Sequence, residues 1–271
     1  MWRRSIFNVY FILCCTAVAP NNVIADNAEW ELGVGIAVLD IPFYPGSSQS
    51  KTYAIPIPHF LYRSERLNID NGIDATLFRA SKIKFNLSAD FAVPVNSKDS
   101  ERRQGMPDLD PVIQIGPSLE LTLSGGRFKP SHFRLELPVR IAIATDLSSI
   151  ETIGWTFEPR LTYETRRPYK TGFAYLVSGG LRFSTAELHQ YYYNVAPAFA
   201  TLTRPQFDSA GGYSGLFVDY IANWRTKNII FFTLLRYQNI GSSAFENSPL
   251  VEQNNYLIFG IGASWIFAKS L

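Results

Sequence analysis

Apolar and polar residues alternate along much of the chain between residues 82 and 184. Its first segment shows the pattern, with Ile83 and Phe85 in one phase and Lys84 and Asn86 in the other. Successive side chains on a strand point to opposite faces, so each such segment has one apolar face and one polar or charged face. The runs are about twelve residues long, whereas strands of soluble sheets average about 5–6 residues. A tilted strand needs about 9–11 residues to cross a bilayer, so the pattern predicts membrane-spanning strands.

The same alternation, read together with turn residues, predicts about eleven strands. In the segment at 152–166, for example, Ile153, Trp155 and Phe157 share the apolar phase. Longer irregular stretches, such as 185–211, predict loops. The predicted strands span residues 29–38, 52–63, 66–79, 82–95, 111–124, 131–144, 152–166, 171–184, 212–224, 228–239 and 255–268.

Single-chain bacterial barrels usually have an even number of strands, with both termini in the periplasm and the longer loops outside. If the loops at 96–110, 185–211 and 240–254 are all external, the strands from residue 111 onward alternate in direction as required. The part of the chain before residue 111 then has one strand too many or too few. A strand hidden around Tyr191–Tyr193 is one way to correct the count. We therefore predict an all-β fold, an antiparallel transmembrane β-barrel of twelve strands, with ten as the alternative. A soluble periplasmic barrel or sandwich is the rival, and it requires the apolar faces to pack inward.

The first 25 residues have the features of a cleavable signal peptide. Arg3 and Arg4 precede an apolar run over about 6–18, and small or medium residues at 23–25 precede the predicted cleavage site. The run is shorter than the ~20 residues that a spanning helix needs. Both cysteines of the chain, at positions 14 and 15, fall in this segment. The mature domain, residues 26–271, is therefore expected to lack disulfides and cysteine-based chemistry.

Composition narrows the function classes further. The 25 basic and 23 acidic residues nearly balance, and no basic stripe or glycine-rich phosphate loop is present, which argues against nucleic-acid binding. Tyr and Phe lie near the ends of many predicted strands, where the aromatic girdles of a membrane barrel occur. No motif indicates a cofactor or a metal site.

The polar phase of three consecutive strands carries a concentration of charges. If the apolar phase faces lipid, these side chains point into the barrel, where opposite charges on neighbouring strands pair at about 5 Å. A buried ionic network that fills the interior is one interpretation; a charged pore lining is the other. The residues are Glu120, Arg134, Glu136, Arg140, Glu158, Arg160 and Glu164.

Two further groups of residues are candidates for function. The loop at 185–211 carries Tyr191, Tyr192 and Tyr193, and exposed tyrosines suit contact with a partner. An outer-membrane hydrolase would instead need a serine, a histidine and an acid brought together. His132 and His189 are the histidines considered for that role, and His189 is able to meet Ser184 or Asp208. No Gly-x-Ser-x-Gly motif supports a hydrolase, so no catalytic residue is assigned.

Short motifs spread over the mature chain carry a family resemblance. They include Gly33–Gly35, Pro42–Ser47, a Pro-x-x-x-Tyr-Arg pattern within Ile57–Arg63, Gly105–Pro111, Tyr191–Pro197, Gly211–Gly215 and Ser248–Val251. In this order they resemble the MipA/OmpV family of Gram-negative outer-membrane proteins.

The resemblance implies an outer-membrane barrel without catalytic residues. It also implies a scaffold role, since one member of that family links a lytic transglycosylase with a murein-synthesising enzyme; others are tied to adhesion, osmotic or antibiotic response. We therefore predict a non-enzymatic barrel in contact with outer-membrane lipid and with murein-remodelling enzymes of the cell envelope. A narrow channel with a charged lumen is the first alternative, and an outer-membrane hydrolase is the second.

Overall fold

The computed structural model describes residues 29–63, 68–70, 76–79, 82–125, 131–146, 148–165 and 171–270. The predicted signal peptide lies outside these residues. Thirteen strand segments form one sheet. They are β1 (Glu29–Pro42), β2 (Ser50–Arg63), β3 (Asn68–Asp70), β4 (Thr76–Arg79), β5 (Ile83–Ala92), β6 (Val112–Ser124), β7 (Ser131–Thr145), β8 (Ile150–Phe157), β9 (Arg160–Thr165), β10 (Gly172–Ser184), β11 (Gly212–Arg225), β12 (Ile229–Asn239) and β13 (Asn255–Lys269).

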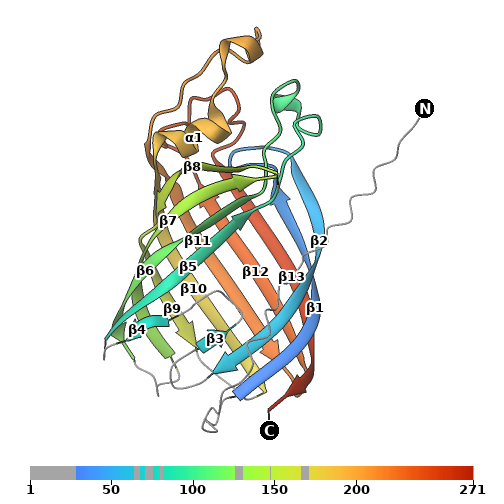
Figure 1. Ribbon diagram of the computed structural model, residues 1–271, viewed down its shortest axis with the longest axis vertical. Helices are drawn as coiled ribbons and strands as arrows, with labels where there is room; N and C mark the ends of the chain where they lie inside the picture. The colour runs from blue at the N-terminus through green and yellow to red at the C-terminus, as the bar shows by residue number, and fades with distance from the viewer. Residues whose placement is uncertain are drawn as a thin grey trace, which may run out of the picture.

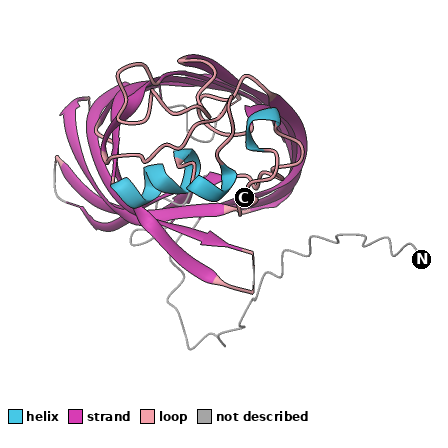
Figure 2. Ribbon diagram, turned by 90° about the horizontal axis from the view of Figure 1, so that it is seen from above, coloured by secondary structure: helices cyan, strands magenta, loops and turns pink. Residues whose placement is uncertain are grey.

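Most strands that follow each other in the chain lie beside each other in the sheet; β3 and β4, and β8 and β9, do not pair with each other. The order is β3-β2-β1-β13-β12-β11-β10-β8-β7-β6-β5-β4, and β9 pairs with β10 and β7. The first and last long strands pair with each other from Glu31↔Lys269 to Asp40↔Phe259. The strands lean across the molecule, and the sheet curls around a central space (Figures 1 and 2). Every pairing in the described sheet is antiparallel, which confirms the predicted all-β antiparallel class.

The segment predicted as one strand at 66–79 is divided. β3 pairs with β2 through Leu61↔Asp70, and β4 pairs with β5 through Thr76↔Asn86. Because β2 and β5 run in opposite directions, their antiparallel partners β3 and β4 also do. The other predicted strand residues in this segment, 66–67 and 71–75, lie outside the described residues.

The strand predicted at 152–166 is also divided, into β8 and β9, because Pro159 lacks the N–H group that a continuous ladder needs. A bulge lies further up this strand, where Ala142 pairs with Gly154 while the next residue of β7 pairs with Thr152. Gly154 has a φ of +127°, a conformation that side chains disfavour. The extra residue, Ile153, is consequently turned inward and buried. Its predicted place on the outer apolar face with Trp155 is wrong.

The outer face of the sheet is apolar and the inner face is polar. Along β1, Val34 and Ile36 are more than half exposed, while Glu31 is buried. On β13, Trp265 is 57% exposed and Ser264 is buried. Soluble sheets bury their apolar faces. The soluble rival, with its apolar faces packed inward, is therefore contradicted.

The long connections gather at one end of the sheet, opposite the end where β1 begins and β13 finishes (Figure 1). They contain the short 3₁₀ helices η1 (Glu101–Arg103) and η2 (Pro197–Phe199) and the α-helix α1 (Ala186–Tyr193). From above, they cross the opening of the curled sheet (Figure 2). The tyrosine run at Tyr191–Tyr193 closes α1, so the prediction of a hidden strand there is wrong. None of the helices in the described part of the chain is long and apolar enough to span a bilayer.

Candidate functional site

The seven charged residues predicted from the polar phase meet on the inner face of the sheet. Glu120 comes from β6, Arg134, Glu136 and Arg140 from β7, Glu158 from the break between β8 and β9, and Arg160 and Glu164 from β9. All lie in one connected set of ion pairs, because strands β6 to β9 are neighbours and the alternation gives them one inward phase. We call this set the ionic wall. Its role in function stays a prediction.

The lower half of the ionic wall is centred on Arg134. Its guanidinium donates to Glu136 Oε1 and to Glu164 Oε2, both at 2.5 Å. Glu136 also accepts from Arg160 Nε at 2.7 Å. Glu120 lies 3.9 Å from Arg134 Nε. Each charge therefore has an opposite charge within reach, which a desolvated charge requires.

The upper half is centred on Glu158, whose side chain is 1% exposed. This carboxylate accepts from Arg182 Nε at 2.7 Å. Arg160 lies 3.6 Å away and Arg140 3.8 Å away. Arg140 also donates from Nε to Ser88 Oγ at 2.9 Å. One buried acid thus faces three arginines.

The strands on either side of the ionic wall carry further inward charges that were not predicted. Lys84 pairs with Glu120 at 3.5 Å, and β10 contributes Arg182. On the next two strands, Asp219 Oδ1 accepts from Arg236 Nε at 2.5 Å. The signal was available, since these residues occupy the polar phase of their own strands.

On the opposite inner face, the part of β13 and β1 nearer the cap is small and apolar, whereas lower down Glu31 of β1 is paired with His59 of β2 and with Arg225 of β11. Gly260 and Gly262 of β13 point toward the interior, and a Cβ added at Gly262 would lie 2.2 Å from the Phe232 ring. Ala37 of β1 is buried beside them, and Ile258 follows in the same phase. Glycine at these positions lets bulky neighbours approach the wall closely.

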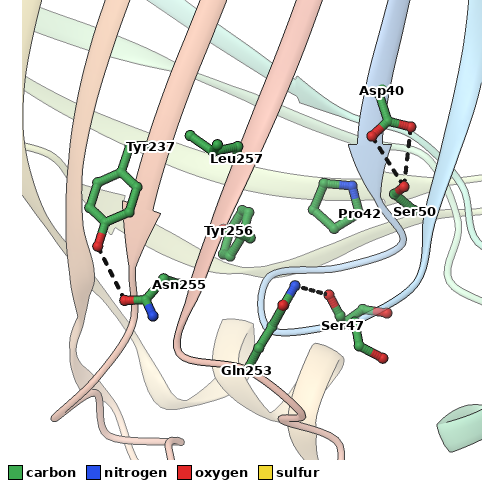
Figure 3. Close-up of a pocket in the computed structure, with 10 residues that line it drawn as sticks. Asp40, Pro42, Ser47, Ser50, Tyr237, Gln253, Asn255, Tyr256 and Leu257 are labelled. Atoms are coloured by element: carbon green, nitrogen blue, oxygen red, sulfur yellow. Dashed lines mark hydrogen bonds between the residues drawn. The ribbon is translucent and has the colours of Figure 1, made fainter.

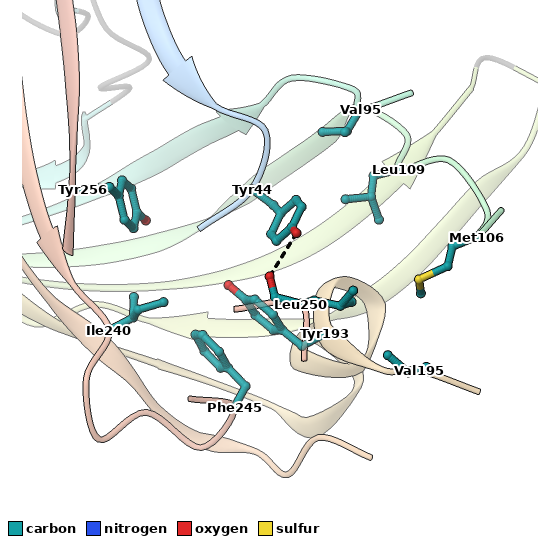
Figure 4. Packing of buried hydrophobic residues seen from close by; sticks show 10 residues of the cluster. All are labelled: Tyr44, Val95, Met106, Leu109, Tyr193, Val195, Ile240, Phe245, Leu250 and Tyr256. Atoms are coloured by element: carbon teal, nitrogen blue, oxygen red, sulfur yellow. Dashed lines mark hydrogen bonds between the residues drawn. The ribbon is translucent and has the colours of Figure 1, made fainter. Parts of the chain in front are cut away.

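The loops above the ionic wall pack into an aromatic core, which we call the cap. The Tyr193 and Phe245 rings stack with centroids 3.7 Å apart, and the Tyr44 hydroxyl donates to the Leu250 carbonyl at 2.9 Å (Figure 4). Burial raises the pKa of Tyr44 to about 12. The buried cap residues are Tyr44, Val95, Met106, Leu109, Tyr193, Val195, Ile240, Phe245, Leu250 and Tyr256.

Arginines tie the polar backbone of the cap together. Arg103 is buried and donates to the carbonyls of Tyr192 and Pro107 at 2.9 and 3.1 Å. Arg204 donates to the carbonyls of Arg102 and Phe199 at 2.8 Å. These bonds satisfy loop carbonyls that no strand pairs, so the cap is an ordered layer.

The three tyrosines predicted as a contact surface belong to the cap. Tyr193 is 3% exposed, so the expected exposure is wrong for this residue. Its ring faces the interior because α1 lies across the opening. Tyr191 and Tyr192 are partly buried against the same core, and the Tyr191 hydroxyl accepts from the Asp110 N–H at 2.8 Å. A partner contact at Tyr191 and Tyr192 stays a prediction.

The histidines considered for hydrolysis have different surroundings. His132 Nε2 lies 2.8 Å from Arg134 Nη1, within the ionic wall. His189 Nδ1 donates to the Ala210 carbonyl, and Nε2 lies 2.7 Å from Ser214 Oγ. That carbonyl takes the place that an orienting acid occupies in a triad. Burial lowers the pKa of His189.

Neither Ser184 nor Asp208, the two described residues proposed to meet His189, hydrogen-bonds to it directly; Ser184 is connected to it through another serine. Ser184 Oγ lies 2.9 Å from Ser214 Oγ, so it reaches the histidine through that hydroxyl. Asp208 instead accepts from Asn194 Nδ2 at 2.9 Å. Ser214 and His189 thus form a buried hydrogen-bonded pair within the cap. Among the described residues, no cluster of three or more His, Cys, Asp or Glu side chains is placed to hold a metal ion.

Two cavities adjoin the cap. The first, of about 350 Å³, lies at the rim between β12, β13 and the β1–β2 connection. Its polar groups are already engaged: Gln253 donates to the Ser47 carbonyl, Ser50 donates to Asp40, and the Tyr237 hydroxyl donates to Asn255 (Figure 3). The second, of about 390 Å³, lies inside the sheet between the cap and the upper ionic wall.

Two solved structures are similar to the chain over most of its length. One is the outer membrane protein OprG from Pseudomonas aeruginosa, 12% identical, with a TM-score of 0.22, over 89% of this chain and 97% of that one. The other is OccK5 (OpdH) from the same organism, 8% identical, with a TM-score of 0.24, over 90% and 98% of the two chains. TM-scores this low carry no conclusion about architecture or function.

No curated protein sequence matches the chain. The family model described as "MltA-interacting protein MipA" matches residues 32–267. That span includes every strand from β2 to β12 and most of β1 and β13. The chain therefore belongs to the MipA family, as the ordered motifs predicted.

Proposed function

We propose that this protein is a non-enzymatic outer-membrane β-barrel that acts as an interaction protein for murein-remodelling enzymes. The observation that carries the membrane position is the arrangement of the two faces. Large apolar side chains such as Ile36 and Trp265 cover the outside, while the charges of the ionic wall are paired inside. Lipid takes the place that a protein core takes in a soluble sheet.

Closure into a twelve-stranded barrel is part of this proposal. β3 and β4 lie at the two ends of the strand order, run in opposite directions and are joined by five residues, 71–75. A hairpin between them would close the sheet. With β8 and β9 counted as one strand, the strand order has twelve positions. That even number favours twelve over the alternative of ten.

The orientation follows the usual rule for bacterial barrels. β1 begins and β13 ends at the end away from the cap (Figure 1). Termini of such barrels lie in the periplasm and long loops lie outside. A murein enzyme would therefore meet the end that carries Glu29, Lys269 and the turn after Arg225. The exposed ammonium of Lys269 there donates to the Lys227 carbonyl at 3.0 Å.

The family supplies the partner class, because its description names an interaction with MltA. We propose that the partner here is a lytic transglycosylase, together with a murein synthase. The short periplasmic turns limit how much surface one barrel offers, so the contact is expected to be small and charged.

Cross-linked cell envelopes test this function. Affinity capture of the protein should recover a lytic transglycosylase, and the double variant K227E/K269E should weaken recovery. The matched control is K98E, an exposed lysine in a loop at the cap end, which should leave recovery unchanged. Recovery of no murein enzyme, or equal loss with K98E, would overturn the proposed partner contact.

The charged interior favours a narrow channel as the second candidate. The cap covers one opening and the ionic wall uses its charges in pairs, so we expect no steady conductance from the refolded chain in a planar bilayer. Unitary steps that change when Arg134 or Arg160 is reversed in charge would instead establish a channel.

A further inference from the structure

Among the described residues, the long strands β2 and β5 face each other with no described strand between them over most of their length. β2 pairs with β3 only at residues 61–63, and β5 pairs with β4 only at residues 84–86. The remaining residues of β2 pair only with β1, and those of β5 only with β6, in the described sheet. β2 and β5 are therefore separated above β3 and β4 (Figure 1).

Chain length limits how far this separation is bridged. Five residues, 71–75, join Asp70 to Thr76. Five residues cannot run alongside the whole of β2 and β5, because an extended chain advances only ~3.3–3.6 Å per residue. Residues 50–58 of β2 and 89–92 of β5 lie beyond that reach. We call this unpaired edge the β2–β5 window.

The backbone at the window is adapted to having no neighbour. β2 carries Pro56 and Pro58, which lack N–H groups and occur in sheets mainly at unpaired edges. On β5, the Phe91 N–H donates to the Asp90 carboxylate at 2.8 Å. An unpaired N–H in lipid is costly. Both strands thus reduce that cost locally, without a pairing partner.

The window is bounded at both ends, by loop contacts on the cap side and by β3 and β4 on the other side. Lys51 at the top of β2 lies 3.6 Å from Asp99 in the loop after β5. In the same place, the Glu101 N–H donates to Gln49 Oε1 at 2.8 Å. β3 and β4 form the boundary at the other end. The opening is therefore a bounded gap in the wall, set in the upper half of the apolar exterior.

The 390 Å³ cavity beneath the cap extends to this window. Its lining includes Ile55 from β2, residues 90–92 from β5 and Val93 directly after that strand. Phe91, which is 59% exposed on the outer surface, is among the lining residues, so the cavity reaches β5 at the strand that borders the window.

We propose that the β2–β5 window is a lateral entrance through which a small, mainly apolar molecule passes between the membrane and the cavity. The inference rests on the membrane position proposed above and is independent of the murein partner. Cavities of about 300–1,000 Å³ with a few polar groups are typical of small-ligand sites.

The lining defines the chemistry of the ligand. Leu39, Leu234 and Ile258 provide an apolar surface, and Tyr193 and Phe245 of the cap cover it from above. At the lower boundary, Thr156 Oγ1 donates to Gln114 Oε1 at 3.0 Å, and the Gln114 amide group can donate in turn. Charged residues also line the cavity, but they are paired: Arg182 with Asp90 and Glu158, and Arg236 with Asp219. A single-chain or aromatic molecule with one neutral hydrogen-bonding group therefore fits this arrangement.

Photolabelling in a reconstituted bilayer tests the route. The probe is a medium-chain alcohol with a diazirine group, and labelled residues are mapped by mass spectrometry. We expect label on lipid-facing Trp265 and on Phe217, which is buried and lines the cavity. Cross-linking of the double variant I55C/A92C with a cleavable bismaleimide should abolish the label on Phe217 and preserve it on Trp265. Reduction of the linker should restore the Phe217 label.

Two controls distinguish closure of the window by the cross-link from the effect of added bulk and from damage to the protein by cross-linking. The same double variant modified with a monofunctional maleimide adds bulk without joining the strands and should keep the Phe217 label. Cross-linked L235C/F259C joins strands that already pair and should also keep it. Phe217 unlabelled in the unmodified protein, or still labelled after cross-linking, overturns the window. Absence of label at Trp265 as well overturns the membrane position itself.

Discussion

The cap and the ionic wall enclose the same interior by opposite means. In the cap, Tyr193 and Phe245 exclude water by stacking. In the ionic wall, Glu158 is buried against three arginines, so each charge depends on its partners. Apolar burial scales with area removed from water, whereas a buried ion pair fails when one partner is lost. The two regions should therefore differ in their response to mutation, pH and salt.

The largest effect is expected for Glu158→Ala. Removing this acid leaves Arg140, Arg160 and Arg182 without their shared partner, and breaking a buried pair costs about 3–5 kcal/mol. We expect the upper end of that range in the free energy of unfolding, measured with urea in lipid vesicles. Glu151→Ala, at an exposed position, is the control. The double variant E158A/R182A should lose less than the sum of its single variants; a fully additive loss would contradict the network.

The next largest effect is expected in the cap. Phe245→Ala removes the ring that stacks on Tyr193, and large-to-alanine changes at buried aromatics cost about 3–5 kcal/mol. We expect the lower end, because loops relax around a cavity more easily than paired strands. The loss should be insensitive to salt, in contrast with E158A. A loss that varies with salt as strongly as E158A would remove the distinction between the two regions.

A smaller, pH-dependent loss is expected from His189. Burial lowers its pKa from the ordinary value of 6.5, so the unfolded chain takes up the proton before the folded chain does. Stability from this group is complete above about pH 6.5 and falls as the pH drops from there toward the folded pKa. Unfolding at several pH values should show this slope, and His189→Gln should remove it. An unchanged slope in the variant would assign it to other groups.

The smallest effect is expected at the exposed rim. Arg102 Nε lies 3.1 Å from Glu252 Oε1, and the Arg102 side chain is 43% exposed. Exposed pairs contribute about 0–1 kcal/mol, so Arg102→Ala should barely change unfolding in urea. A loss comparable to that of F245A would show that the rim is part of the cap's stabilisation.

The sequence predicted the elements that depend on alternation. Period-two patterns located the long strands, and the inward phase placed all seven residues of the ionic wall on one face. Arg182 and Asp219 obey the same rule and were missed only because the pattern was followed over too few strands. Ile153 was misplaced because the shift in register depends on the φ of Gly154, which alternation does not encode.

The cap could not be predicted in the same way. Its core joins Tyr44, Val95, Tyr193 and Leu250, which lie far apart in the chain and meet only because the strands bring four connections to one end. Such contacts have no local period. The tyrosine run at 191–193 was therefore interpreted as a strand or as exposed loop, whereas the loops around it make it helical and bury Tyr193.

The pairing of β1 with β13 has a consequence for assembly kinetics. This ladder joins residues 31–40 to residues 259–269, so it brings together segments that lie far apart in the chain. Contacts of such sequence separation carry a large loop-closure entropy and form slowly. Until β13 docks, both strands keep an unpaired edge that another chain can add to. The protein is therefore exposed to aggregation in the interval before this ladder forms, and a chaperone that covers either edge would protect it.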